Sequence, residues 1–180
     1  TTDAARQKHA SGIRLFVENE LFLGGSSQYI LPYVAGKILD LLNTASSNAQ
    51  LSGLCLIMEF LELRREFHEI LFTRFAHCFR TLFNQNPQNL DDKVIILSSL
   101  TLARYARVGG SLCYDFISDT IENCVQGLCA NPMKDTDRSR FLSISLLTQL
   151  LPLVPSLFTP YIDEFFVAIW FSLRDTSPPI

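Results

Sequence analysis

The strongest constraint on the fold is an apolar pattern of helical period that recurs along nearly the whole chain. Near the C-terminus, Ile162, Phe165, Phe166, Ile169 and Trp170 fall at i, i+3, i+4, i+7 and i+8, which places five large side chains on one helical stripe. Three further stripes have the same spacing: Val34, Ile38, Leu41 and Leu42; Leu71, Phe75, Phe79 and Leu82; and Tyr114, Ile117, Ile121, Cys124, Val125 and Leu128. No segment shows the period-2 alternation of a half-buried strand. The sequence therefore predicts an all-α protein.

Turn and capping residues divide this pattern into eight expected helices. Gly24-Gly25 ends the first helix, Asn48 is expected to cap the third, and Asp91 or Asp92 to cap the fifth. Gly109-Gly110 ends the fifth helix, and Asp135 or Asp137 caps the seventh. Pro32 either starts the second helix at about residue 31 or kinks it. The expected helices are 3–22, 27–43, 48–63, 67–84, 91–107, 111–129, 137–151 and 158–173.

The expected helices repeat at an even interval. Alternate helices begin near residues 3, 48, 91 and 137, and a period of about 40–47 residues is typical of HEAT and armadillo repeats. We therefore expect one α-solenoid segment over residues 1–180, built from about four HEAT-like antiparallel helix pairs. A globular helical bundle is the alternative. Segments 51–63, 94–106 and 141–151 are apolar on several sides, so we expect neighbouring repeats to cover them.

The two ends of the chain suggest a piece of a longer protein. The chain does not begin with Met, and Ser177-Pro178-Pro179-Ile180 resembles the start of a further helix, because Pro is favoured at a first helical position. A cut solenoid would expose an apolar C-terminal end. We therefore expect self-association through that end. We also expect Trp170 to be buried, so that Trp170→Ala costs about 3–5 kcal/mol.

Composition narrows the classes of partner and compartment. The formal net charge is −3, which offers no general attraction to nucleic acid. No apolar run has the length of a transmembrane segment. The cysteine count is odd and no Cys-x-x-Cys pair occurs. We interpret all five cysteines as reduced, buried thiols of an intracellular protein: Cys55, Cys78, Cys113, Cys124 and Cys129.

Chemical motifs give no catalytic, cofactor or metal site. His77-Cys78, with His68 before it, is more simply explained by packing, because adjacent helical residues point about 100° apart. The pairs Glu59/Glu62 and Asp163/Glu164 are also weak candidates for acid–base work. We expect Glu59 and Glu62 to face water, and Asp163 and Glu164 to complement a helix dipole. Phosphate-binding and hydrolase motifs are absent from the sequence.

Basic residues gather at some of the expected turns: Arg64-Arg65, Arg104 with Arg107, and Lys134 with Arg138 and Arg140. A ridge of such turns would suit an acidic protein partner, although a solvated turn is the simpler interpretation. The partner-binding residues are unknown at this stage.

Particular segments resemble the N-terminal HEAT region of the TOR (target of rapamycin) protein kinases, in a divergent form. The resemblance is carried by Val154-Pro155-Ser156-Leu157-Phe158, by Tyr161 to Trp170 with its Phe165-Phe166-Val167-Ala168, by Ser46-Ser47-Asn48-Ala49-Gln50 with Gly53-Leu54 and Ile57, and by Ala4-Ala5-Arg6. The chain departs from the family's usual residues at Ser52 and at Gln50-Leu51. The matching residues are packing residues, so no contact residues carry over.

The resemblance implies a non-catalytic scaffold within a serine/threonine kinase of the phosphatidylinositol-3-kinase-related class, with the kinase domain outside this chain. It also implies assembly with a Raptor-type subunit and a Rheb-type small GTPase in growth signalling, in the cytoplasm or at endomembrane surfaces. One alternative is a HEAT-repeat transport or adaptor protein, such as a karyopherin-like cargo binder with an acidic concave face. Another is a small all-α enzyme.

Overall fold

A computed structural model describes the backbone of residues 2–130 and 137–173, and the side chains of residues 2–129 and 137–167. All regular elements in these ranges are helical, so the all-α prediction is confirmed. The α-helices are α1 Asp3–Phe22, α2 Ser27–Leu42, α3 Ser47–Phe60, α4 His68–Phe83, α5 Asp92–Gly109, α6 Tyr114–Ala130, α7 Asp137–Leu150, α8 Pro155–Phe158 and α9 Ile162–Leu173. Four short 3₁₀ turns join some of them: η1 Arg65–Phe67, η2 Pro87–Asn89, η3 Gly110–Cys113 and η4 Thr159–Tyr161.

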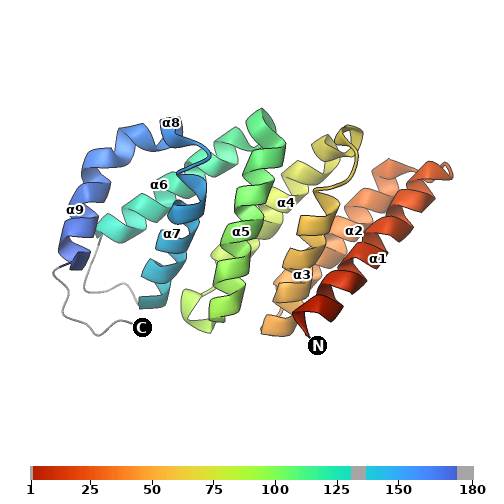
Figure 1. Cartoon of the computed structure of the whole chain (residues 1–180), viewed down its shortest axis with the longest axis horizontal. Coiled ribbons are helices and arrows are strands. Elements are labelled where there is room, and N and C mark those ends of the chain that lie inside the picture. The colour runs from red at the N-terminus through yellow and green to blue at the C-terminus, as the bar shows by residue number, and fades with distance from the viewer. Residues whose placement is uncertain (1, 131–136, 174–180) are drawn as a thin grey trace.

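The helices form two layers that extend in one direction (Figure 1). Helices α1, α3, α5 and α7 lie side by side in one layer, and α2, α4, α6 and α9 form the other. The four helices of the first layer begin at residues 3, 47, 92 and 137, which are 44, 45 and 45 residues apart. This even translation is the solenoid-like arrangement predicted from the sequence, and α1 and α7 lie at opposite ends of the layer.

The core lies between the two layers and is densest around α3. Leu54, Ile57 and Phe60 of α3 have no exposed surface, because α1 and α5 flank this helix while α2 covers its inner side. The expectation that segment 51–63 is covered on several sides is therefore confirmed. Segments 94–106 and 141–151 are each partly exposed on one side, since Ile96 of α5 and Ile144 of α7 are 48% and 47% exposed.

An aromatic cluster joins the second helix pair to the third. Tyr105 of α5 stacks on Phe72 of α4 with a ring separation of 4.7 Å, and its ring meets Phe79 and Phe116 edge to face. The Tyr105 hydroxyl donates a hydrogen bond to the Phe72 carbonyl oxygen at 2.9 Å. Such aromatic pairs stabilise packing beyond the apolar area they bury.

Two of the predicted helix boundaries are confirmed in atomic detail. The Asp91 carboxylate accepts a hydrogen bond from the Lys93 backbone N–H at 2.9 Å, which caps α5. Gly110 ends α5 with φ of +51°, a conformation that favours glycine. The proposed cap at Asn48 is wrong: Ser46 occupies the N-cap position of α3, and the side-chain Oδ1 of Asn48 instead accepts a hydrogen bond from Arg6 of α1.

Other boundaries differ from the expectation. α2 begins at Ser27, and Pro32 lies inside it, partly buried. Proline removes one backbone donor there, but its position near the helix start limits the loss to the Gln28 carbonyl. The expected last helix is divided into α8, η4 and α9, because Pro160 in η4 interrupts the hydrogen-bond ladder. α7 begins at Asp137. The predicted cap at Asp135 or Asp137 cannot be compared with the structure, because residues 131–136 lie outside the described part.

The apolar stripes are confirmed on α4, where Leu71, Phe75, Phe79 and Leu82 are all buried. On α6 the stripe residues Ile117, Ile121, Cys124 and Val125 are buried but Tyr114 is 53% exposed, and on α9 Phe166 is 65% exposed. Placing Tyr114 and Phe166 on buried stripes was therefore wrong, since both lie where no neighbouring helix covers them. The expected burial of Trp170 concerns a side chain outside the described ones and stays a prediction.

Candidate interaction surfaces

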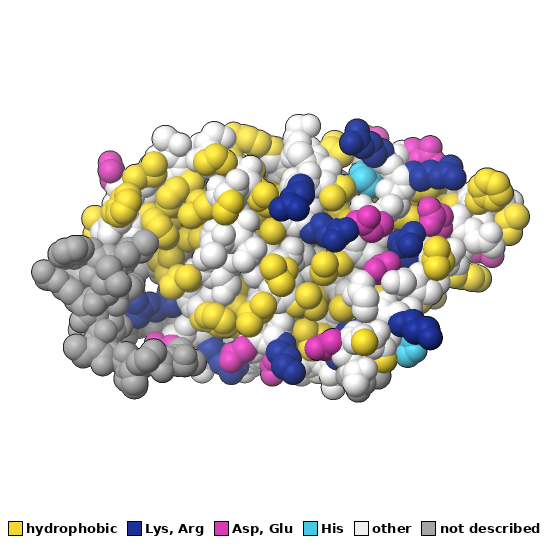
Figure 2. Space-filling view, in the orientation of Figure 1, with side chains coloured by type: hydrophobic (Ala, Val, Ile, Leu, Met, Phe, Trp, Pro, Cys, Tyr) yellow, Lys and Arg dark blue, Asp and Glu magenta, His cyan; other side chains and the backbone are white. Residues whose placement is uncertain are grey.

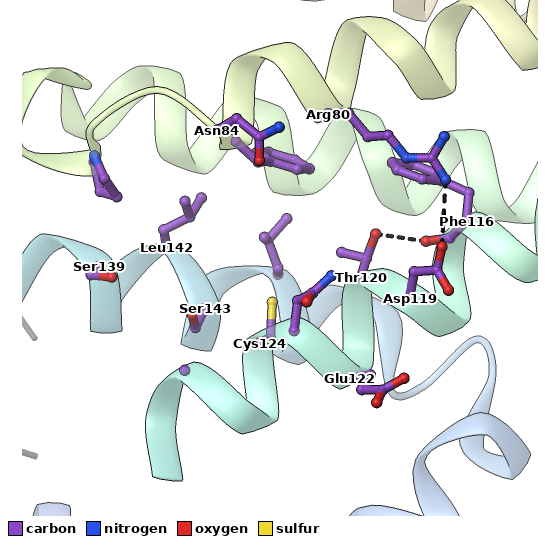
Figure 3. A pocket seen from close by; sticks show the side chains of 15 residues that line it. Arg80, Asn84, Phe116, Asp119, Thr120, Glu122, Cys124, Ser139, Leu142 and Ser143 are labelled. Atoms are coloured by element: carbon purple, nitrogen blue, oxygen red, sulfur yellow. Dashed lines mark hydrogen bonds and ion pairs between the residues drawn. The ribbon is translucent and has the colours of Figure 1, made fainter. Parts of the chain in front are cut away.

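A groove of about 770 Å³ lies between α4 and α6, with α7 as its floor. It exists because the two helices diverge. Phe79 and Phe116 stack near one end, with ring centroids 6.2 Å apart, whereas α4 otherwise packs against α2 and η3, and α6 packs against α7 and α9. The space between them is therefore filled by neither helix (Figure 3).

One end of the groove is closed by a charged contact. Arg80 of α4 lies over the Phe116 ring, 5.2 Å from its centroid, and a guanidinium nitrogen is 3.4 Å from the Asp119 carboxylate. Both side chains are more than half exposed, so this ion pair contributes little to stability. The pair matters for binding because it places a cation and an anion side by side at this end of the groove (Figure 3).

The open part of the groove is lined by amides. Asn84, at the end of α4, and Asn123, on α6, are both exposed. Within the described chain neither side-chain amide has a hydrogen-bond partner. Each offers one acceptor and two donors, which is the complement of an extended peptide backbone. Leu142 and Leu146 of α7 supply an apolar floor. The groove is therefore suited to a protein segment.

Cys124 also lines the groove, but it is not a reactive thiol. Burial raises the pKa of Cys124 to about 12, and a hydrogen bond with Ser143 lowers that pKa by a smaller amount. The nucleophilic form of a cysteine is the thiolate, so this side chain is held in its inert form. We find no histidine among the lining residues to act as its base.

The sequence did not predict this groove. Its width depends on the distance in space between α4 and α6, which are far apart in the sequence. One signal was available. Asp119 and Asn123 are four residues apart, with Glu122 between them, so α6 carries a polar face opposite its apolar stripe. A polar face of this kind is also typical of an ordinary solvated helix, which is why it was not singled out.

The histidine and cysteine residues considered as a metal site do not lie together in the structure. The His68 ring is buried, and its Nε2 is 2.9 Å from the Leu63 carbonyl oxygen, so it closes the turn before α4. His77 is exposed, while Cys78 is buried on the other side of α4, so the packing explanation holds for Cys78 but is wrong for His77. Within the described residues no group of three or more His, Cys, Asp or Glu side chains is placed to hold a metal ion.

The carboxylate candidates have different surroundings. Glu59 is only 13% exposed and accepts hydrogen bonds from Arg14 at 3.1 Å and from Gln7 at 2.5 Å, so it ties α3 to α1. Placing it in water was wrong, because α1 reaches over it. Glu62 is about half exposed and pairs with Arg104 of α5. Asp163 and Glu164 are exposed in the first turn of α9, as expected for a favourable interaction with the helix dipole.

The basic turns are partly structural. Arg138 of α7 donates hydrogen bonds to the backbone oxygens of Gln88 and Leu90 and pairs with Asp92 at 3.3 Å. It therefore fixes α7 to the start of α5. Arg64 and Arg65 are exposed at η1, and Arg107 is exposed near the end of α5. Lys134 lies outside the described residues.

Four of the five thiols are buried as predicted, and one is not. Cys129 is exposed near the end of α6, where its thiol donates a hydrogen bond to the Glu164 carbonyl oxygen at 3.3 Å. The expectation of five buried thiols is therefore wrong at Cys129, which lies beyond the cover that α7 gives to Cys124. No helix of the described chain combines the length and apolarity needed to cross a bilayer.

Comparison with known proteins gives relatives in one class. The chain is 24% identical over 152 residues to the serine/threonine-protein kinase TOR of Arabidopsis thaliana, 25% over 145 residues to tor1 of Schizosaccharomyces pombe, and 24% over 148 residues to TOR2 of Saccharomyces cerevisiae. These alignments cover 84%, 80% and 78% of this chain but only 6% of each relative. No family model and no solved structure matches. The chain is thus distantly related to a segment of these kinases.

Proposed function

We propose that the chain is a non-catalytic scaffold in the HEAT-type helical region of a TOR-like serine/threonine kinase, whose catalytic domain lies elsewhere in the parent protein. The observation that carries the proposal is the distant similarity to three TOR kinases along about four-fifths of the chain. The repeating two-layer stack supports it, because stacked helix pairs present long surfaces to partners. The transport-adaptor alternative has only the helical repeat in its favour.

We further propose that the parent assembles with a Raptor-type subunit and a Rheb-type small GTPase, in the cytoplasm or at an endomembrane surface. The groove between α4 and α6 is our candidate for the contact with the Raptor-type subunit. Its exposed amides and apolar floor would accept a polypeptide segment.

The test uses the full-length parent. Its coding sequence should contain a kinase domain of the lipid-kinase-like class, and the tagged protein should co-purify with a Raptor-type subunit. Asn123→Arg places a bulky side chain in the groove and should reduce the recovered subunit about tenfold or more, since a bound segment would lose the space and the amide contacts that it uses.

The matched control is Asn19→Arg, an exposed asparagine on α1 outside the groove, which should leave recovery unchanged. A parent without a kinase domain contradicts the proposed origin. Equal loss with both variants, or no loss with either, contradicts the groove as the contact. Capture of basic signal peptides in place of the Raptor-type subunit supports the transport alternative.

A further inference from the structure

A second cavity, of about 510 Å³, lies in the other layer, between α1 and α5 and above α3. Its walls come from the first residues of α1 and of α5, and Leu51 and Cys55 of α3 line its floor. Figure 2 shows hydrophobic side chains on this face between α1 and α5, with Lys and Arg side chains along the nearby lower edge. This cavity is separate from the groove between α4 and α6.

A buried cation lines the cavity. Arg6 is only 7% exposed. One terminal nitrogen of its guanidinium contacts Asp3 at 2.5 Å, and the other donates to Asn48 at 3.2 Å. Its Nε is buried and has no partner in the described chain. A buried donor without an acceptor is costly, but this nitrogen has almost no accessible surface, so an anion in the cavity would interact with the guanidinium through its charge.

A second cation and two helix termini reinforce this preference. Lys93, in the first turn of α5, lines the cavity, and its ammonium group has no partner among the described residues. α1 begins at Asp3 and α5 at Asp92, and these N-terminal ends lie at the same edge of the layer (Figure 1). The positive ends of both helix dipoles therefore also favour an anion.

The nearby carboxylates are already engaged. Asp3 pairs with Arg6, the Asp91 oxygen caps the Lys93 backbone N–H, and Asp92 pairs with Arg138. The Arg6 charge also reaches the cavity floor: burial raises the pKa of the Cys55 thiol, and Coulombic attraction to Arg6 is the largest opposing cause. Asp3 and Glu59 raise the same pKa, so the cavity is of mixed charge, and Lys93 is the cation at its wall that has no partner among the described residues.

The wall formed by α5 is apolar. Ile96 and Leu100 are one helical turn apart, line the cavity, and are 48% and 44% exposed. A surface with adjacent apolar side chains and a cation without a partner is complementary to a segment that carries apolar side chains and a carboxylate. Apolar side chains of such a segment would cover Ile96 and Leu100, while a carboxylate would reach Arg6 and Lys93.

We propose that this cavity is a docking site for a short segment of a protein partner in which Asp or Glu lies within one helical turn of Leu, Ile or Phe. The carboxylate accepts from Lys93 Nζ and lies near the positive charge of the Arg6 guanidinium, and the apolar side chains pack on Ile96 and Leu100. The proposal goes beyond the assembly suggested above and does not depend on the origin of the chain from a TOR-like kinase.

The test is selection from a random 12-residue peptide library displayed on phage, with the 180-residue chain immobilised. We expect enriched peptides to combine an acidic residue with a nearby Leu, Ile or Phe. One enriched peptide, labelled with fluorescein, then serves as the probe for anisotropy titrations. Its affinity should fall about tenfold or more for Lys93→Glu and for Ile96→Ser, equivalent to about 1.4 kcal/mol or more.

Two matched variants separate the site from general effects. Lys37→Glu reverses an exposed lysine on α2, in the other layer, and Ile144→Ser alters an equally exposed isoleucine on α7. Both should keep the affinity within about twofold, and circular dichroism should show all four variants helical. Replacing the acidic residues of the peptide by Asn or Gln should also abolish binding.

Three results would overturn the proposal. The first is the absence of an acidic and apolar consensus among the selected peptides. The second is binding that Lys93→Glu leaves intact, or that the control variants reduce equally. The third is Lys93-dependent binding to vesicles of phosphatidylserine and phosphatidylcholine that displaces the peptide, since the cavity would then recognise an anionic membrane.

Discussion

At the scale of single residues, the aromatic cluster around Tyr105 holds adjacent helix pairs together. Tyr105 is 1% exposed, contacts rings from α4 and α6, and donates its hydroxyl hydrogen to the Phe72 carbonyl oxygen. The sequence indicated that segment 94–106 is buried, but it gave no sign that a hydroxyl would find an acceptor on α4. That match depends on the register between two helices.

Substitutions at Tyr105 should separate these contributions. Tyr105→Phe removes one buried hydrogen bond and should lower the free energy of unfolding by about 0.5–1.5 kcal/mol. Tyr105→Ala also leaves a cavity and should cost about 3–5 kcal/mol. Urea titration measures both, and Tyr29→Ala, at a side chain that is 79% exposed, should change stability by less than about 0.5 kcal/mol. Equal effects at the two tyrosines would contradict the cluster.

The buried thiols predict a loss of stability at high pH. Burial raises the pKa of Cys78 to about 12 from an ordinary value of 9.0. Above pH 9 the unfolded chain therefore releases this proton while the folded chain keeps it. Stability contributed by the thiol is complete below pH 9 and falls as the pH rises toward 12. Cys113 and Cys124, whose pKa values rise to about 11 and about 12, act in the same direction.

The measurement is the difference in unfolding free energy between pH 8 and pH 10. In Cys78→Ala this difference should be smaller than in the wild type by about 1.4 kcal/mol, the value of one pKa unit. Burial and the Glu164 carboxylate raise the pKa of the exposed Cys129 less than burial raises the pKa of Cys78, so Cys129→Ala serves as the comparison and should reduce the difference less than Cys78→Ala does. A wild-type difference that Cys78→Ala does not reduce would contradict the burial of this thiol.

At the scale of helices, close approach at Gly109 connects α5 to α4. A Cβ atom at Gly109 would lie 2.7 Å from the Phe72 Cδ1 atom and 2.9 Å from the Cys113 sulfur, and closer still to Phe72 Cε1. Such contacts force the neighbours to move. Gly127 of α6 is the opposite case, because a Cβ atom there would meet nothing within 4 Å.

We therefore expect Gly109→Ala to destabilise the protein by about 1–3 kcal/mol and Gly127→Ala to stabilise it by about 0.5–1 kcal/mol, the usual gain inside a helix. Thermal unfolding followed by circular dichroism measures both. Stabilisation by Gly109→Ala would show that α5 does not approach Phe72 as described.

The sequence predicted helices well where local chemistry decides their ends, as at Asp91 and Gly110. It predicted poorly where packing decides. Phe166 has the spacing of a buried residue, yet whether it is buried depends on which helix comes next to it. The two cavities also could not be predicted, since Asn84 with Asn123, and Arg6 with Lys93, are brought together only by the distance between helices that are remote in the chain.

At the scale of the whole molecule, the stack exposes apolar side chains at both ends. Phe22, Leu23, Tyr29 and Tyr33 of the first helix pair are between 67% and 79% exposed, and Phe166 and Val167 of α9 are 65% and 56% exposed. Internal repeats bury such residues against a neighbour. The sequence anticipated this exposure only for the C-terminal end.

We expect the isolated 180-residue chain to self-associate through these ends as its concentration rises. Multi-angle light scattering should show a growing mean mass, and the double variant Phe22→Asp, Tyr33→Asp should reduce the growth, since charge at a contact opposes burial. Ile144→Asp, on the exposed side of α7, should not. A constant monomer mass for the wild type would contradict this expectation.

The central claim is that the helix pairs are translated along one direction instead of surrounding a single core, and double electron–electron resonance tests it directly. Two doubly labelled proteins are needed, both with Cys129→Ala. One carries spin labels at Lys8→Cys of α1 and Leu100→Cys of α5, and the other carries them at Lys8→Cys and Ile144→Cys of α7. Helices in contact lie about 8–10 Å apart, so the stack predicts separations of about 16–20 Å to α5 and about 24–30 Å to α7 before the label arms are added. An α1–α7 distance equal to or shorter than the α1–α5 distance would contradict the stack.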